Sequence, residues 1–320
     1  MTLGWIFGYS ANLIYPTTIL AVKNSVLSCI LFLWMACAGL MACTSAQTPV
    51  MPRPPAPKLG AFDATTLKDL KLSDVPIVPT LSENAKQIYQ AALKAGSNPK
   101  AFSKLGDCMT ETPYFLGPFG AGQFDLGAQS SLKSVLDQFE KGSFSRKGLA
   151  AAGGFNVAGP LDSTWSDPQR CKGGESPLAC EYRTHKPSIA LIMFGTNDVS
   201  YTEPDAYNFY LRSIVIQTLD ANVLPVLSTF PTRPENVEKS LLLNQIALKV
   251  ARDYDLPLIN LNRALEPLPN HGVDPADTIH LSVPPDKRVD VFTPEHLQFG
   301  FTVRNLVTLQ TLETIVNATK

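Results

Sequence analysis

Residues 188 to 198 read SIALIMFGTND, and this stretch decides the fold class. It begins with an almost continuous apolar run, as expected for a strand that is buried on both faces of a sheet. Gly195, Thr196, Asn197 and Asp198 follow at once, so a turn with polar side chains stands where the strand ends. Ligands of layered α/β domains gather at the carboxyl ends of such strands. The stretch therefore predicts both a buried parallel strand and a polar edge that can form a site.

Strands and helices alternate on both sides of this stretch. Apolar runs predict three further strands, at residues 101–106, 223–230 and 256–261. Amphipathic periodicity predicts helices up to residue 95 and at residues 128–141, 205–220, 234–254 and 297–317. This alternation is typical of a parallel, doubly wound sheet with helices on both faces. We therefore expect an α/β fold.

The composition excludes several classes of protein. The 320 residues include 27 Lys and Arg against 28 Asp and Glu, so the formal net charge is −1. This balance gives no electrostatic footprint for nucleic acid or for an acidic membrane surface. With 45% hydrophobic and 17% charged residues, the chain is not a disordered protein.

The N-terminal segment is predicted to be an export signal. Residues 1–52 carry a single charged side chain, Lys23, which precedes an apolar run at residues 26–42. A basic residue, a short apolar segment and small residues describe a secretory signal. The run ends in Leu-Met-Ala before Cys43 and so resembles the bacterial lipobox, whose cysteine is acylated. An uncleaved membrane anchor is the alternative, because the run is barely long enough to span a bilayer.

On the first interpretation the chain is a lipoprotein on the extracytoplasmic face of a membrane, with its lipid on Cys43. The uncharged residues 1–22 are unusual for a signal and leave the true start of the protein open. A proline-rich stretch follows and is expected to be a stiff spacer without a core. We divide the chain into a signal (1–43), a tether (44–72) and a single domain (73–320).

Three cysteines lie beyond the signal. Cys171 and Cys180 flank the turn-rich loop CKGGESPLAC, and outside the cytoplasm such a pair usually closes as a disulfide. Cys108 has no partner near it in sequence, which argues against a thiol redox protein. None of the histidines stands at metal-ligand spacing from another histidine or a cysteine, so we expect no zinc site.

Polar residues with chemical potential follow several predicted elements. Cys108 comes after Gly106-Asp107 at the end of a strand, where a nucleophile would be exposed, although most unpaired cysteines are buried structural residues. Asp277 stands three residues before His280 and can orient an imidazole that acts as a general base. Such pairs are also common by chance on surfaces. His296 is the rival base, but it has no carboxylate at a comparable spacing.

Two further segments could stabilise a developing negative charge. Asn197 can donate its side-chain amide to an oxyanion, or else form an ordinary turn at the strand end. The backbone of the glycine loop, AAGGF at residues 151–155, can approach a substrate closely, or else be flexible.

Taken in order, these segments resemble the SGNH family of GDSL-type hydrolases. The resemblance covers residues 100 to 320, and its most specific parts are DTIHLS at residues 277–282 and the strand that leads into GTND. It implies a flavodoxin-like, three-layer α/β/α fold in a single domain. It also implies Cys108, Asp277 and His280 as the catalytic residues, with the backbone at Cys108, Gly154 and Asn197 as oxyanion donors.

The resemblance further implies hydrolysis of ester bonds in lipids or acylated carbohydrates, without a metal or an organic cofactor. This sequence departs from the family because Cys108 stands where the family has serine. A thiol is intrinsically nucleophilic, so a Cys-His pair can still transfer acyl groups, and we expect His280 to lower the pKa of the thiol. The alternative is a catalytically inactive module with the same fold that binds cell-surface glycan.

Overall fold

The apolar run at the centre of the sequence forms the central strand of a sheet. It corresponds to β2 (Pro187–Met193), which is buried along its whole length. The computed structural model describes residues 55–319, and its main sheet has the order β1 (Asn98–Gly106), β2, β3 (Leu224–Ser228) and β4 (Leu258–Ile259). All three neighbouring pairs are parallel.

A further stretch of chain lies beside β1 at its other edge. Ala151 forms a parallel bridge with Gly106, whose N–H donates to the Ala150 carbonyl oxygen at 3.2 Å. Along the chain this stretch stands between β1 and β2, whereas in the sheet it and β2 flank β1. The strand order therefore reverses at β1, as in a doubly wound sheet. Crevices for ligands form at such a reversal, so the residues after Gly106 occupy the place where a site is expected.

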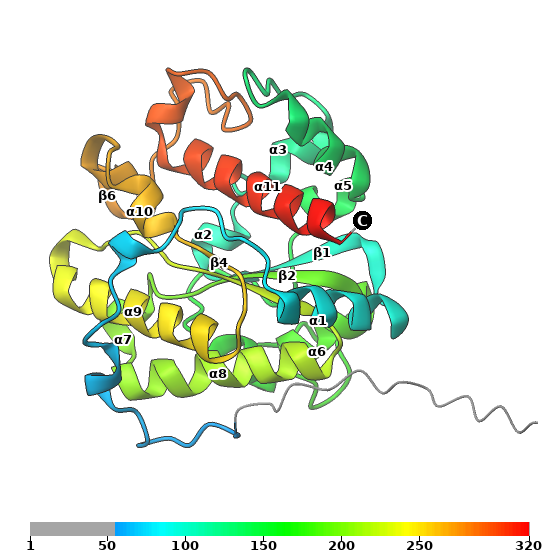
Figure 1. The fold of residues 1–320 in the computed structure, drawn as a ribbon, viewed down its shortest axis with the longest axis vertical. Coiled ribbons are helices and arrows are strands. Elements are labelled where there is room, and N and C mark those ends of the chain that lie inside the picture. Colours follow the sequence, from blue (N-terminus) through cyan, green and yellow to red (C-terminus); the bar gives the residue numbers. More distant parts are fainter. Residues whose placement is uncertain (1–54, 320) are drawn as a thin grey trace, which may run out of the picture. The chain divides into compact units, whose positions relative to one another are not determined.

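Helices cover both faces of the sheet, which confirms the predicted three-layer α/β/α fold. In Figure 1, α11 lies above the strands and α6 and α8 lie below them. The Tyr182 and Thr218 hydroxyl groups hydrogen-bond at 2.8 Å and join α6 to α8. The longer helices are α1 (Glu83–Lys94), α6 (Pro177–His185), α8 (Pro204–Asp220), α9 (Val237–Asp253) and α11 (Gly300–Ala318).

Short elements fill the connections. The short helices are α2 (Cys108–Glu111), α3 (Gly117–Ala121), α4 (Lys133–Gln138), α5 (Lys141–Ser145), α7 (Asp198–Tyr201) and α10 (Leu261–Leu265). A hairpin of β5 (Val273–Asp274) and β6 (Asp277–Leu281) precedes α11. The 3₁₀ turns are Ala64–Leu67, Leu72–Asp74, Ser130–Leu132, Gly159–Leu161, Ser163–Trp165, Pro234–Asn236, Pro269–Gly272 and His296–Gln298.

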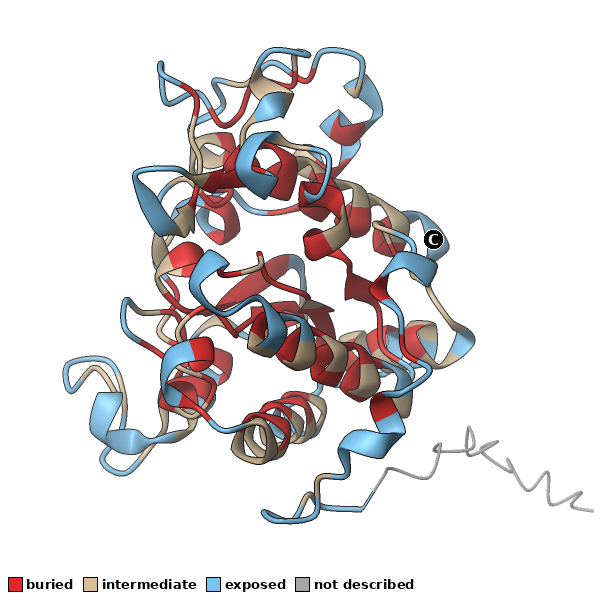
Figure 2. Cartoon of the chain, turned by 90° about the vertical axis from the view of Figure 1, so that its left-hand side faces the viewer, coloured by how far each residue is buried: buried red, intermediate tan, exposed pale blue. Residues whose placement is uncertain are grey.

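Burial follows the layers. Figure 2 shows buried residues along the strands and on the helix faces turned toward them, with exposed residues on the outer faces and the loops. The side chains of β2 are inaccessible on both sides because a helical layer covers each face, which explains why this strand is almost continuously apolar rather than alternating.

The predicted helix at residues 128–141 is broken in the structure. A 3₁₀ turn and α4 end at Gln138, and Phe139 is extended. The next residue, Glu140, donates its backbone N–H to the Lys100 carbonyl oxygen at 2.8 Å. This bond to the start of β1 requires extended chain, so tertiary contact overrides the helical pattern here.

Part of the predicted tether packs on the domain. Leu67, Leu70 and Leu72 are buried in the core, and Gln245 of α9 donates its side-chain amide to the Leu70 carbonyl oxygen at 2.9 Å. Asn260 likewise donates to the Leu72 carbonyl oxygen at 2.7 Å. The packed domain therefore begins before residue 73, because the leucines between residues 67 and 72 are buried in its core. The prolines earlier in the segment led to the prediction of a spacer without a core.

The predicted signal, the membrane anchor and the lipidation site at Cys43 lie outside the described residues. Within residues 55–319, the helices are all too short or too polar to span a bilayer.

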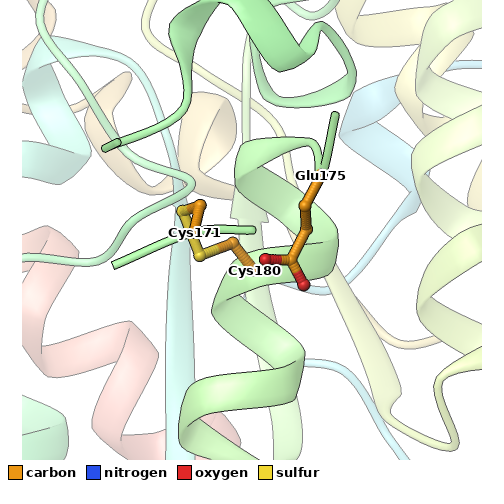
Figure 3. Close-up of side chains that lie close together, drawn as sticks. All are labelled: Cys171, Glu175 and Cys180. Carbon is orange, nitrogen blue, oxygen red and sulfur yellow. A yellow bond between two sulfur atoms is a disulfide. The ribbon is translucent and has the colours of Figure 1, made fainter. Parts of the chain in front are cut away.

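The predicted disulfide between Cys171 and Cys180 is present and ties the loop after residue 159 to α6 (Figure 3). Glu175 lies beside it and forms an ion pair with Arg183 at 2.7 Å. Cys171, Glu175 and Cys180 lie close enough together to suggest a metal site. Both sulfur atoms are bonded to each other, however, so neither offers a thiolate ligand.

Candidate active site

Cys108 begins the first helical turn after β1. Gly106 ends the strand, and a Cβ atom there would collide with the Met193 carbonyl oxygen and the Thr110 side chain, so only glycine permits this close approach. Asp107 caps the turn, because its Oδ1 accepts the Met109 N–H at 3.0 Å. The chain thus turns sharply, and the half-buried Cys108 stands at the carboxyl end of β1, as its sequence predicts.

Asp277 and His280 meet in the hairpin that precedes α11. The Asp277 Oδ2 lies 2.6 Å from His280 Nδ1, and its Oδ1 accepts the Ile279 N–H at 3.1 Å. The bond to His280 is the main cause that lowers the pKa of the Asp277 carboxyl. A carboxylate held on Nδ1 leaves Nε2 as the nitrogen that can exchange protons with a substrate or a nucleophile.

Ser282 holds the end of this hairpin in place. Its hydroxyl donates to the Gly272 carbonyl oxygen at 3.1 Å and accepts the Gly300 N–H at 2.9 Å. The start of α11 and the hairpin are thereby joined, which fixes the segment that carries His280.

His296, the rival base, also has a carboxylate partner. Its Nε2 lies 3.0 Å from Asp286 Oδ2, and its Nδ1 lies 3.0 Å from the Thr293 hydroxyl. The expectation that His296 lacks such a partner is wrong, because the loop brings together residues ten apart in sequence. Both of its ring nitrogens are engaged, so His296 has no nitrogen left to act as a base without breaking a bond.

The hairpin interacts electrostatically with the turn that carries Cys108. Burial, then Arg304, then weaker interactions that include His280 set the pKa of Asp107, which is raised to about 6. Asp277 is likewise among the groups that raise the pKa of Cys108. The Asp277–His280 pair therefore lies within electrostatic range of the turn that carries the thiol.

The thiol of Cys108 does not have the lowered pKa that its sequence suggests. Burial and then the neighbouring Asp107 raise its pKa to about 12. Within the described residues, no hydrogen bond joins its sulfur to His280, whose Nδ1 is held by Asp277. The expectation took only the effect of the His280 imidazole into account. Burial in a low-dielectric environment and the carboxylate of Asp107 both favour the neutral thiol. At neutral pH the resting group is therefore a thiol.

Asn197 and Asp198 hold the glycine loop from the end of β2. The Asn197 side-chain amide donates to the Phe155 carbonyl oxygen at 2.8 Å, and Asp198 Oδ1 accepts the Val157 N–H at 3.1 Å. Gly195 permits this path, since its φ is +139° and a Cβ atom would collide with the Phe230 ring. The structure thus brings together Asn197 and the glycine loop. This bond uses one of the two N–H groups of the Asn197 amide.

The two glycines of the loop differ. Gly154 is exposed with φ +83°, so its backbone is open to solvent. Gly153 donates its N–H to the carboxylate of Glu111, which also pairs with Lys147. Gly154 therefore offers the freer backbone amide of the two.

Sequence reasoning missed Arg304, which lies beneath the candidate nucleophile. Its guanidinium donates to the Met109 carbonyl oxygen and, at 3.0 Å, to the Thr110 hydroxyl, and it stacks 3.7 Å from the Phe115 ring centroid. It is buried, and burial lowers its pKa to about 9. A single basic residue inside the otherwise uncharged start of α11 was the signal that could have identified it.

The arrangement has the parts of an acyl-transfer site. A nucleophilic atom, an imidazole oriented by a carboxylate, and amide donors come from four segments: the turn after β1, the glycine loop, the turn after β2 and the hairpin. The described residues offer no cluster of free ligands for a metal around Cys108.

The chain matches neither a known protein family nor a curated protein sequence. It is similar to several solved structures. A lipase/acylhydrolase from Enterococcus faecalis has 16% identity and a TM-score of 0.43 over 68% of this chain and 96% of its own. A variant of an acetyl xylan esterase from Geobacillus stearothermophilus has 15% identity and a TM-score of 0.46 over 68% and 95%. A GDSL-like lipase from Bacteroides thetaiotaomicron has 14% identity and a TM-score of 0.39 over 72% and 98%.

Proposed function

We propose that this protein hydrolyses ester bonds through Cys108, His280 and Asp277. The observation that carries the proposal is the 2.6 Å bond between Asp277 and His280 on a hairpin within electrostatic range of Cys108, at the strand where the sheet order reverses. A carboxylate-oriented imidazole beside a nucleophile is the arrangement that acyl transfer requires.

The reaction then proceeds in two steps. His280 Nε2 takes the thiol proton while the sulfur of Cys108 attacks the acyl carbon. The negative charge that develops on the carbonyl oxygen is stabilised by the backbone N–H groups of Cys108 and Gly154 and by the Asn197 amide. Collapse breaks the ester bond, and His280 returns the proton to the leaving alcohol.

In the second step water hydrolyses the acyl-thioester. His280 takes a proton from the water, the acid leaves, and the proton returns to the sulfur of Cys108. No metal or organic cofactor takes part. The raised pKa of Cys108 means that proton removal must accompany attack rather than precede it, so the approach of His280 is a requirement of the first step.

The substrate class we propose is an acyl ester of a lipid or a carbohydrate. We further propose that the domain works outside the cytoplasm, held to the membrane by a lipid on Cys43 or, alternatively, by an uncleaved N-terminal anchor. Both tethers rest on the sequence of residues 23–43.

The second candidate function is a non-catalytic module that binds cell-surface glycan. It is favoured by the neutral thiol of Cys108 and by two largely exposed aromatic side chains, Trp165 and Tyr201. Aromatic faces at a surface suit stacking on sugar rings.

Turnover of short-chain nitrophenyl esters by the full chain separates the two functions. The hydrolase predicts turnover that disappears in Cys108→Ala and persists or rises in Cys108→Ser, because a hydroxyl fits the same proton transfer. No turnover in either the native chain or the serine variant would leave the binding module.

A further inference from the structure

The connection between β3 and α9, residues 229–236, is held more firmly than an ordinary loop. Phe230 exchanges two backbone bonds with the Asn244 side chain, at 2.8 Å and 2.9 Å. The Asn262 amide donates to the Thr232 hydroxyl at 2.9 Å. Buried asparagines on α9 and α10 thus fix the backbone of this connection at the carboxyl edge of the sheet.

The residue that this loop presents is Arg233. Its own N–H donates to the Ser240 hydroxyl at 3.0 Å, and its side chain is only 8% exposed. Its Nη1 donates to the Thr196 carbonyl oxygen at 2.8 Å, and its Nη2 pairs with Glu235. The Thr196 peptide leads directly into Asn197, so the guanidinium fixes the backbone from which the oxyanion donor projects.

The charge of Arg233 also reaches the candidate nucleophile. Burial lowers the pKa of its guanidinium, and Cys108 and Asp277 are the next groups that act on it, in the opposite direction. Tyr201 and Asp107 follow. The Arg233 side chain therefore interacts with the residues of the site, and it does so from the connection after β3.

Asp107 and Asp277, two other charged groups that act on Cys108, each have a partner of opposite charge. Asp107 has Arg304 close enough to lower its pKa, and Asp277 is bonded to His280. The counter-ion of Arg233, Glu235, has a half-exposed side chain, whereas that of Arg233 is buried. Water screens Glu235 more than Arg233, so the loop supplies net positive potential to the site.

We propose that Arg233 is a positioning residue of the candidate active site, which fixes the Thr196 peptide beside Asn197 and supplies positive charge that stabilises the anion formed at Cys108. The inference rests on the proposed function in that it takes Cys108 as the reacting group. A positive charge near a thiol favours the thiolate. Lowering the pKa of the thiol by one unit gives a thiolate fraction that is about tenfold larger.

Alkylation of Cys108 in the full chain tests the charge without requiring ester turnover. The rate of modification by iodoacetamide at pH 8.5 is followed by mass spectrometry of the peptide that contains Cys108. Arg233→Met should lower this rate about tenfold, because loss of the positive charge raises the pKa of the thiol by about one unit and so reduces the thiolate fraction about tenfold. Glu235→Gln should raise it, because the counter-ion is removed. Arg212→Met is the matched control, since Arg212 pairs with Asp253 and should leave the rate unchanged.

A second reagent separates charge from loosening of the loop. In Arg233→Met, the rate of alkylation by the anionic iodoacetate should fall more than the rate of alkylation by the neutral iodoacetamide. In Arg233→Lys, which keeps the charge, the rate with iodoacetate should fall less than it does in Arg233→Met. A purely structural role predicts the reverse sign, because a loosened loop exposes Cys108 and accelerates both reagents. The inference would be overturned if Arg233→Met reacted faster than the native chain. It would also be overturned if Arg233→Met, Glu235→Gln and the native chain all reacted at the same rate.

Ester turnover tests the positioning part. Arg233→Lys should lower kcat with little change in KM. Asn197→Ala should lower kcat by a smaller factor in the Arg233→Lys background than in the native chain, because both substitutions act on the same donor. Full additivity would contradict the positioning role. If no variant turns over esters but the alkylation rates change as expected, the proposed function fails and the charge assignment stands.

Discussion

The side-chain amide of Asn197 donates a hydrogen bond to the Phe155 carbonyl oxygen, 2.8 Å away, and so joins the end of β2 to the glycine loop. Two of the three proposed oxyanion donors therefore belong to one bonded unit. Asn197 therefore has a structural role besides its proposed chemical role, and its variants must separate the two.

Asn197→Ala should lower kcat far more than it changes KM, since the free N–H of the amide acts on the transition state. Loss of one such donor typically costs about 2 to 4 kcal/mol. Steady-state kinetics on a nitrophenyl ester measures it, with the stability of the variant checked by thermal unfolding. Asn208→Ala on α8 is the control, and an equal loss in both variants would contradict the role of Asn197.

His280→Ala should reduce ester turnover by at least about a hundredfold, whereas His296→Ala should leave it nearly unchanged. The two residues form a matched pair, because each has a carboxylate partner at 3.0 Å or less. Only His280 has a ring nitrogen free of protein bonds. Steady-state rates at pH 8 decide the question, and the opposite ranking would move the base to His296.

Asp198 should make the protein less stable as the pH rises from about 4 to 6. Burial raises the pKa of this carboxyl to about 6, so in this window the folded chain holds a proton that the unfolded chain releases. Two pH units correspond to at most about 3 kcal/mol. Asp198→Asn should remove this part of the slope and raise the free energy of unfolding at pH 7.

Urea unfolding at several pH values measures the effect. Asp137→Asn, at an exposed position of α4, is the control and should leave the slope as it is. A slope that is the same in Asp198→Asn and the native chain would show that Asp198 is ionised in the folded protein.

The disulfide should stabilise the loop that precedes α6. Opening it by replacing Cys171 and Cys180 with serine should cost about 2 to 3 kcal/mol for a loop this short. Thiol labelling of the native, non-reduced chain should modify neither residue. Labelling of both would show that the bond is absent in solution.

Cys43 should carry a lipid, and residues 1–42 should be missing from the mature protein. Intact mass of the membrane fraction measures both at once. A Cys43→Ala variant provides the control, since it should keep the leader and lose the added mass. An unacylated native chain that retains residues 26–42 would indicate a spanning anchor instead.

The positions of the strands and of their polar ends could be predicted because they depend on local pattern. β2 is apolar throughout since both of its faces are covered, and Gly195 to Asp198 follow it since the chain must turn there. Asp277 and His280 were recognisable for a similar reason, as their bond spans only three residues.

The missed features depend on contacts between distant residues. Arg233 lies in the connection after β3 and Arg304 lies on α11, and nothing in the neighbouring sequence indicates what their side chains contact. The pKa of Cys108 was predicted in the wrong direction because burial is a property of the assembled fold. The early start of the domain was missed since Leu67 and Leu70 find their core only when α9 is in place.

The bond between Gly153 and the carboxylate of Glu111 has a consequence for engineering of this protein. Glu111 stands three residues after Cys108, so the glycine loop is bonded through Gly153 to the turn after β1 and through Phe155 to Asn197 at the end of β2. Loop exchange between related scaffolds would break both bonds. A library that varies the loop must therefore preserve Glu111 and Asn197, and also Gly159, where a Cβ atom would collide with the Phe155 ring.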